Sequence, residues 1–226
     1  MDGIVDLILV GDSLAMVMLG HQDTKKVSMN EMLHHTKAVA SGAKKTLIVG
    51  DMPINTYTTK EDALLNAKLF IDAGAQAIKI EGDKPDIVKA LVSIGIPVMG
   101  HIGVTPQSFD VYKVQGKDDA TAKKLLVEAQ RLEHAGCFSI VLECVATQTA
   151  KMITEALHIP TIGIGAGKFC SGQILVVHDM LGLYTDFKPK FVKRYAQLAE
   201  DMKKAFLEFK HDVEGEKFPS EKESYQ

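Results

Sequence analysis

The sequence of 226 residues lacks the features that mark several classes of protein. Its net charge at neutral pH is only −3, so it has no excess of basic residues to bind nucleic acid or an anionic membrane. No apolar run approaches the roughly 20 residues that a membrane-spanning helix needs. The opening stretch, MDGIVDLILVGDS, has acidic residues where a secretory signal peptide has basic ones. We therefore expect a protein that binds neither nucleic acid nor a membrane.

The sequence is also poor in cysteine. Cys137, Cys144 and Cys170 form no CxxC pair and no even-numbered framework, so a disulfide scaffold is not expected. Zinc normally takes Cys or His ligands at close spacing, and these scattered cysteines do not provide them. His34 and His35 are adjacent but fall in a stretch of helical character, where a solvated or core role is expected. Three unpaired cysteines favour a reduced, cytoplasmic compartment.

The composition that remains is that of a globular protein. Apolar residues make up 46% and charged residues 24%, a balance that can bury a core. We expect one domain over residues 1–213, followed by a polar tail over residues 214–226. From Lys190 to about Val213, apolar residues recur at helical spacing. This stretch would complete an outer ring of helices or serve a subunit contact.

Short β-branched runs alternate with amphipathic stretches along the chain. This alternation predicts parallel strands joined by right-handed helical crossovers. In the expected helix after residue 59, Thr59 suits the N-cap, and Gly136 suits the end of a later helix. The expected strands lie within residues 5–13, 46–52, 77–82, 96–103, 138–144, 159–167 and 173–179.

Seven strands fit either an open doubly wound sheet or a (β/α)8 barrel that lacks one strand. No GxGxxG motif opens the first unit, and titratable residues recur where strands end. Both features favour the barrel. Asp179 is the exception among these residues, because its position before an expected helix indicates an N-cap. The others are Asp12, Asp51, Glu81, His101 and Glu143.

The stretch AIKIEG, residues 77–82, places two opposite charges on one face of an expected strand. Alternate side chains share a face, so Lys79 and Glu81 point together, away from Ile78 and Ile80. A buried charge is costly unless it is paired, hydrogen-bonded or bound to a metal. The pair therefore indicates either a structural ion pair or the polar wall of a pocket, and both roles can coexist.

Three carboxylates with few histidines beside them indicate a hard cation with oxygen ligands. Asp12, Asp51 and Glu81 fit Mg²⁺, which is held by one or two carboxylates together with water and a substrate. Lys79 could neutralise an oxyanion on that substrate. Glu143 follows a buried strand and suits a general base. The glycines of GIGAG, residues 163–167, allow either an anion-binding backbone or only a tight turn.

These motifs together resemble the ketopantoate hydroxymethyltransferase family. They follow the family's order from Asp6 to about Tyr195, and such a colinear set does not arise from fold similarity alone. The stretches that carry the resemblance are LVGDSLAMVMLGHQDT, VGDMPINTY, AIKIEG, VMGHIGVTPQS, YKVQGK, IVLECV, ITEALHIPTIGIGAG, GQILVVHDMLG and PKFVKRYA.

The resemblance implies a fold, a reaction and a role for each site residue. The fold is a (β/α)8 TIM-type barrel of the phosphoenolpyruvate/pyruvate-like kind. The reaction is Mg²⁺-dependent transfer of a hydroxymethyl group from 5,10-methylenetetrahydrofolate to 3-methyl-2-oxobutanoate, giving 2-dehydropantoate. Asp12 and Asp51 would hold Mg²⁺, with Glu81 near the metal or bound to it through water. The 2-oxo acid would contact Asp12, Ser13, Asp51 and Lys79, and Glu143 would accept the proton.

The family usually has a further strand and helix before the position of Met1, so the first βα unit is expected to be missing from this chain. This leaves two alternatives to an active transferase. One is a truncated, inactive homologue, and the other is a different metal-dependent enzyme of the same barrel superfamily that forms or cleaves C–C bonds of 2-oxo acids. The resemblance also implies a homo-oligomer, as a decamer.

Overall fold

The computed structural model describes residues 1–107 and 113–225. The chain divides into two compact units, residues 1–174 and residues 175–226, each described here by itself. The expected single domain over residues 1–213, with a tail over 214–226, stays a prediction. Among the helices that the structure describes, none combines the length and the apolar character needed to cross a bilayer.

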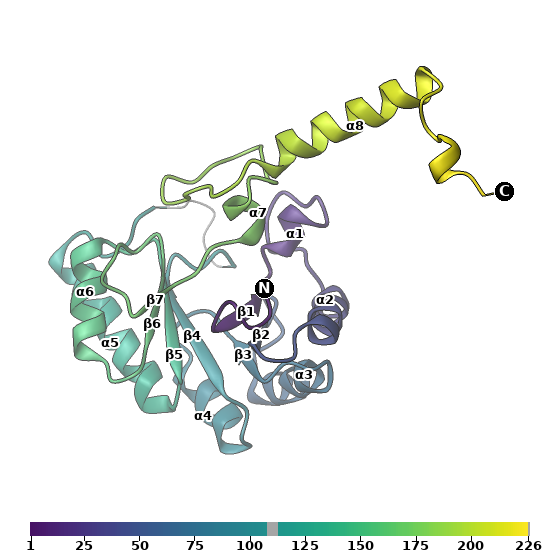
Figure 1. The fold of residues 1–226 in the computed structure, drawn as a ribbon. Coiled ribbons are helices and arrows are strands. Elements are labelled where there is room, and N and C mark those ends of the chain that lie inside the picture. Colours follow the sequence, from purple (N-terminus) through teal and green to yellow (C-terminus); the bar gives the residue numbers. More distant parts are fainter. Residues whose placement is uncertain (108–112, 226) are drawn as a thin grey trace. The chain divides into compact units, whose positions relative to one another are not determined.

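The first unit is an α/β fold built on one parallel sheet. All seven strands pair in sequence order, and the sheet curls with its helices on the outer side (Figure 1). Each strand therefore ends at the same edge as its neighbours. The strands are β1 (Leu7–Val10), β2 (Leu47–Asp51), β3 (Ala77–Lys79), β4 (Val98–Gly103), β5 (Ser139–Glu143), β6 (Thr161–Ile164) and β7 (Gly172–Gln173).

The helices of the first unit follow the strands, as the crossover pattern predicted. Thr59 accepts a hydrogen bond from the Asp62 N–H at the start of α3, and Gly136 ends α5 in the left-handed conformation, so both predicted caps are confirmed. His34 and His35 lie in a helix, as expected. The helices are α1 (Leu14–Val17), α2 (Met29–Gly42), α3 (Lys60–Asp72), α4 (Pro85–Ser93), α5 (Asp119–Ala135) and α6 (Thr147–Ala156).

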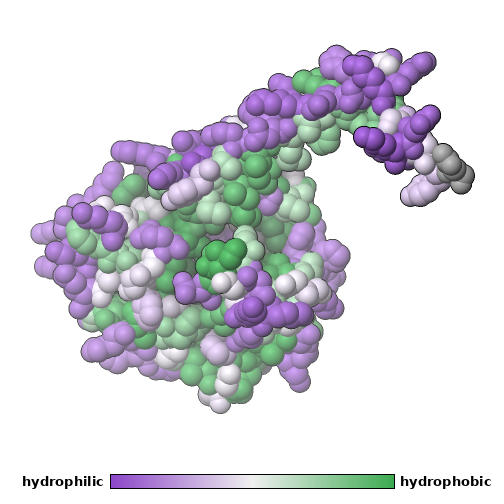
Figure 2. Space-filling view, in the orientation of Figure 1, coloured by the Kyte–Doolittle hydropathy of each residue, from purple (hydrophilic) through white to green (hydrophobic). Residues whose placement is uncertain are grey.

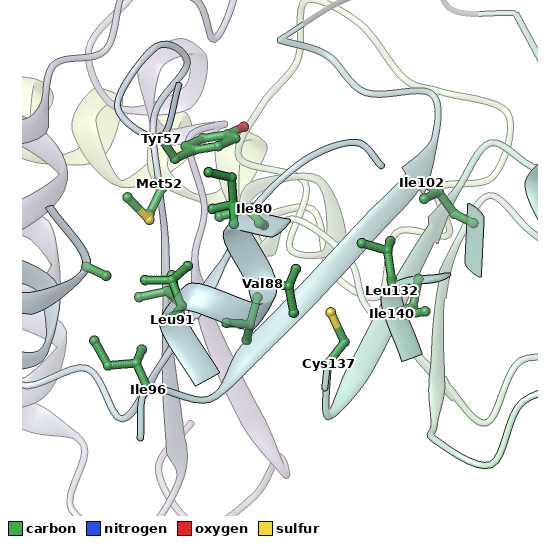
Figure 3. Close-up of a cluster of buried hydrophobic side chains, with 14 of the residues drawn as sticks. Met52, Tyr57, Ile80, Val88, Leu91, Ile96, Ile102, Leu132, Cys137 and Ile140 are labelled. Carbon is green, nitrogen blue, oxygen red and sulfur yellow. The ribbon is translucent and has the colours of Figure 1, made fainter. Parts of the chain in front are cut away.

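The two faces of the sheet carry different apolar clusters. Ile78, Ile80 and Ile140 belong to the large cluster between the sheet and the helices, where Val88, Leu91 and Leu132 face the strands (Figure 3). A smaller cluster on the inner face contains Val49, Ala77, Met99 and Val141. The predicted alternation of side chains along β3 is confirmed.

The seventh expected strand, within residues 173–179, is largely wrong. Only Gly172–Gln173 pairs with β6, and the apolar run that follows enters a short helix, α7 (Val177–Met180). Asp179 therefore lies inside the first turn of that helix, and Val176 rather than Asp179 is its N-cap. An apolar run of this length does not by itself distinguish a strand from a helix.

The second unit contains α7, α8 (Leu198–Glu214) and the short 3₁₀ helix η1 (Glu221–Glu223). The expected helix from Lys190 begins eight residues later than predicted, because the backbone N–H of Tyr195 donates to the Met180 carbonyl instead of continuing a helix. No residue of α8 is buried, and Figure 2 shows both hydrophilic and apolar side chains along it. Its large exposed apolar side chains are Met202, Phe206, Leu207, Phe209 and Val213.

Candidate active site

Titratable side chains from neighbouring strands meet at the carboxyl edge of the sheet. Four of them are at most 5% exposed: Asp12, Asp51, Glu81 and His101. Lys79 is equally buried at 3%. Glu143 is the most accessible, with 16% of its side chain exposed. The structure thus brings together the residues that the strand-end pattern singled out.

A tight turn after β1 places Asp12 against Asp51. The Leu14 N–H donates to the Gly11 carbonyl, and the Ala15 N–H donates to the Asp12 carbonyl, which starts α1. The Asp12 N–H donates to Asp51 Oδ2 at 3.1 Å. Burial and the nearby Asp51 charge raise the pKa of Asp12 to about 7. Asp12 and Asp51 are therefore adjacent buried carboxylates, and a cation would relieve the repulsion between their charges.

Lys79 forms buried ion pairs, one of the two roles that the sequence allowed for it. Parallel pairing sets Lys79 beside Asp51, and its Nζ lies 2.7 Å from Asp51 Oδ1 and 3.6 Å from Glu81 Oε1. Burial disfavours the charged amine, but the carboxylates of Asp51, Glu81 and Asp12 outweigh it and raise the pKa of Lys79. Lys79 therefore remains an ammonium group in the middle of the site.

His101 lies between two carboxylates. Its Nδ1 is 3.2 Å from Glu81 Oε1, and its Nε2 is 3.2 Å from Glu143 Oε2. Neither contact has the alignment of a good hydrogen bond, so the interaction is mainly one of charge. Burial and the Lys79 charge oppose protonation, but Glu143 and Glu81 prevail and raise the pKa of His101 to about 9. A protonated His101 thus links Glu81 to Glu143.

Sequence reasoning missed Gln107 and Tyr57. Gln107 is 4% exposed, and its Nε2 donates to Asp12 Oδ2 at 3.0 Å and to the Met52 carbonyl at 3.1 Å. The Tyr57 hydroxyl donates to Gln107 Oε1 at 2.5 Å. Both residues fall inside stretches that carry the family resemblance, but neutral side chains outside the strands give no charge pattern to mark them.

Ser13 and the glycines of residues 163–167 lie at the same edge of the sheet. Ser13 is the N-cap of α1, but its side chain makes no capping hydrogen bond and is half-buried. Gly167 has a φ of +80°, and a Cβ there would lie 2.6 Å from the Thr147 side chain, so a tight turn accounts for this glycine. Anion binding by this turn stays a prediction.

The charges of the site favour a divalent cation. Within the described part of the chain, four carboxylates meet here, from Asp12, Asp51, Glu81 and Glu143, and Lys79 and His101 are the basic side chains that pair with them. The carboxylates outnumber the cationic side chains, as suits a site that binds a cation. Among the described residues, no group of three or more His, Cys, Asp or Glu side chains is arranged to hold a metal. Two carboxylates suffice for Mg²⁺, which keeps several waters or substrate oxygens.

Glu81 is better placed beside such an ion than on it. Its Oε1 faces His101 and Lys79, and its Oε2 accepts the backbone N–H of Gln107 at 3.2 Å. Asp12 and Asp51 remain the residues predicted to supply carboxylate ligands to Mg²⁺. The binding and catalytic roles of the individual residues stay predictions.

Gly103 supports the position of Glu143. It has a φ of +101°, and a Cβ there would lie 2.3 Å from the Glu143 carbonyl oxygen. We expect Gly103→Ala to lower the free energy of unfolding by at least ~2 kcal/mol, because it adds both backbone strain and a clash with backbone. Chemical denaturation of the variant and the wild type measures this change.

Gly95→Ala is the matched control for this substitution. Gly95 has a φ of +83°, but a Cβ there would meet nothing within 4 Å. Its cost should be the backbone strain alone, about 1 kcal/mol. Equal losses for the two variants would show that the close approach to Glu143 is unimportant.

Comparison with known proteins identifies the family. The family model for ketopantoate hydroxymethyltransferase matches residues 1–221. The chain belongs to the ketopantoate hydroxymethyltransferase family, whose members are transferases. A curated relative from Syntrophobacter fumaroxidans, named 3-methyl-2-oxobutanoate hydroxymethyltransferase, is 56% identical over 222 residues. That match covers 95% of this chain and 79% of the relative.

Solved structures support the fold at low sequence identity. A 2,3-dimethylmalate lyase of the PEP mutase/isocitrate lyase superfamily matches with a TM-score of 0.62 at 14% identity, covering 97% of this chain and 79% of that one. A phosphonopyruvate hydrolase, solved in complex with oxalate and Mg²⁺, matches with a TM-score of 0.61 at 12% identity, covering 92% of this chain and 76% of that one. At these identities the likeness supports the α/β fold alone.

Proposed function

We propose that this chain transfers a hydroxymethyl group from 5,10-methylenetetrahydrofolate to 3-methyl-2-oxobutanoate, giving 2-dehydropantoate for pantothenate biosynthesis. The observation that carries the proposal is one continuous buried network, in a chain of this family. It runs from the Asp12–Asp51 pair through Lys79 and Glu81 to His101 and Glu143.

Asp12 and Asp51 would hold Mg²⁺ where the 2-oxo acid binds. The ion would act as a Lewis acid that draws electron density from the keto group and makes the C3 proton more acidic. The two aspartates fit this role because they supply hard oxygen donors in a site with an excess of negative charge. The solved phosphonopyruvate hydrolase of similar fold is a complex with oxalate, a small dicarboxylate, and Mg²⁺.

Lys79 would stabilise the negative charge that develops on the substrate oxygen. Its ammonium group is fixed by Asp51 and Glu81, so it need not reorganise as the enolate forms. The Ser13 hydroxyl makes no capping hydrogen bond to α1, follows Asp12 directly in the sequence and would donate to the same substrate.

Glu143 would remove the C3 proton. Its carboxylate lies 3.2 Å from the His101 Nε2, and this contact would fix its orientation. Over the whole reaction the methylene carbon loses both of its C–N bonds to the folate. A C–C bond to C3 of the enolate replaces one of them, and a C–O bond to the oxygen of water replaces the other. Tetrahydrofolate leaves with both nitrogens protonated, one by the proton taken from C3 and one by a proton from the water.

The proposal also includes the fold, a TIM-type barrel. Parallel strands paired in sequence order are the arrangement of a TIM-type barrel, which supports the proposal of such a barrel for this chain. The expected decameric assembly and the cytoplasmic location likewise stay predictions.

The test is product formation from both substrates. With Mg²⁺ present, we expect 2-dehydropantoate and tetrahydrofolate to appear in equal amounts, and chelation of the metal by EDTA to stop the reaction. Turnover of the 2-oxo acid without folate would favour a different C–C bond enzyme of the superfamily. A folded chain that turns over neither substrate would favour the inactive homologue.

A further inference from the structure

Gln107 is the hub of a buried hydrogen-bond network that joins the ends of three strands. Its side chain reaches Asp12 after β1 and the Met52 carbonyl after β2. Its backbone N–H donates to Glu81 after β3 at 3.2 Å. No charge on Gln107 itself explains this placement, and its side chain is too well buried for a surface role.

The orientation of the Gln107 amide is fixed by its partners. The Met52 carbonyl can only accept a hydrogen bond, so the amide atom 3.1 Å from it must be the nitrogen. The Tyr57 hydroxyl then donates to the amide oxygen, and burial raises the pKa of Tyr57, which keeps that proton in place. A single orientation of the Gln107 amide therefore satisfies all three hydrogen bonds: its nitrogen donates two and its oxygen accepts one.

This arrangement has a consequence for Asp12. One amide N–H of Gln107 is used on Met52, and the other is used on Asp12 Oδ2. The donor fixes the plane of the Asp12 carboxylate and takes up part of the charge on Oδ2. Such hydrogen-bonded neighbours of a ligating carboxylate commonly change metal affinity by 10–100-fold when they are removed.

We propose that Gln107 is a positioning residue that orients the Asp12 carboxylate for a divalent cation and thereby sets the affinity of the site for that cation. The inference rests on the proposed function in one respect, which is that Asp12 is a ligand of Mg²⁺. Gln107 acts through Asp12 and contacts no reacting atom.

The neutral donor is essential to this role. A carboxylate at position 107 would place an acceptor against Asp12 Oδ2 and the Met52 carbonyl, so Gln107→Glu should disrupt both contacts. A methionine has nearly the same length and volume but forms none of these hydrogen bonds, so Gln107→Met should keep the packing and remove the hydrogen bonds to Asp12, to the Met52 carbonyl and from Tyr57. Tyr57→Phe removes the donor that holds the amide oxygen and leaves the amide itself in place.

The experiment measures Mg²⁺ binding by isothermal titration calorimetry, with the full chain and no substrate. We expect Gln107→Met to weaken Mg²⁺ binding about 10-fold or more. Gln107→Glu should weaken it at least as much, and Tyr57→Phe less. In turnover assays, Gln107→Met should need more Mg²⁺ for half-maximal rate but should approach the wild-type kcat at saturating Mg²⁺.

Gln76→Met is the matched control. The Gln76 side chain also accepts a hydrogen bond from a strand, the Ile48 N–H at 2.8 Å, but near the start of β2 and away from the site. The Gln76→Met substitution should leave the Mg²⁺ affinity unchanged. A thermal melt of each variant verifies that it is folded, and Tyr57→Phe serves if Gln107→Met does not fold.

Wild-type Mg²⁺ affinity in both folded Gln107→Met and folded Tyr57→Phe would overturn the proposal. The proposed function fails separately, if the wild type binds Mg²⁺ but forms no 2-dehydropantoate. In that case a weakened Gln107→Met would still support the positioning role of Gln107.

Discussion

Replacing Glu143 by glutamine is expected to lower kcat by about 10²–10⁴-fold, the usual contribution of a general base. Glutamine keeps the length of the side chain and can face His101 through its amide oxygen, but it cannot accept the C3 proton. Glu143 lies at the end of the charge network and is the most accessible of its carboxylates, as a group that must reach a substrate should be.

Binding of the 2-oxo acid should survive this substitution. Asp12, Asp51 and Lys79 supply proposed substrate contacts. Among the described residues, none of these three forms an ion pair with Glu143. Calorimetric titration with 3-methyl-2-oxobutanoate and Mg²⁺ should give an affinity within a few-fold of the wild type. Loss of binding together with turnover would argue against a role as the base.

Replacing Asp51 by asparagine should have the second large effect, on metal-dependent binding. Asp51 is 1% exposed, and its two oxygens accept from Lys79 and from the Asp12 N–H. Loss of its charge removes one of the two proposed Mg²⁺ ligands and the main counter-ion of Lys79. We expect Mg²⁺-dependent binding of the 2-oxo acid to weaken by at least about 10-fold.

The same substitution should also lower stability, because breaking a buried ion pair leaves the Lys79 charge poorly compensated. A loss of about 3 kcal/mol in the free energy of unfolding is expected. Asp72→Asn, at the exposed end of α3, is the control and should change neither quantity. An Asp51→Asn variant with an unchanged Mg²⁺ titration would contradict the assignment of Asp51 as a ligand.

The sequence predicted the parts of the fold that depend on periodicity. Six of the seven strands lie within the expected stretches, and Lys79 and Glu81 share one face of the sheet because side chains alternate along a strand. The meeting of Asp12, Asp51, Glu81, His101 and Glu143 followed from parallel topology alone, since all parallel strands end at one edge.

The parts that could not be predicted depend on tertiary contacts. An apolar run after Gln173 has the composition of a strand, yet it becomes α7. The helix expected from Lys190 begins at Leu198 because Tyr195 bonds to a distant carbonyl. Gln107 and Tyr57 join the site through hydrogen bonds between segments 50 residues apart, and no local pattern records such a bond.

The most direct test of the account is exchange of the C3 proton of 3-methyl-2-oxobutanoate in heavy water, followed by NMR with Mg²⁺ and without folate. This isolates proton removal by Glu143 from the later transfer step. The account predicts exchange that requires the metal and is lost in Glu143→Gln. A folded wild-type chain that binds the 2-oxo acid and Mg²⁺ but shows no exchange would contradict it.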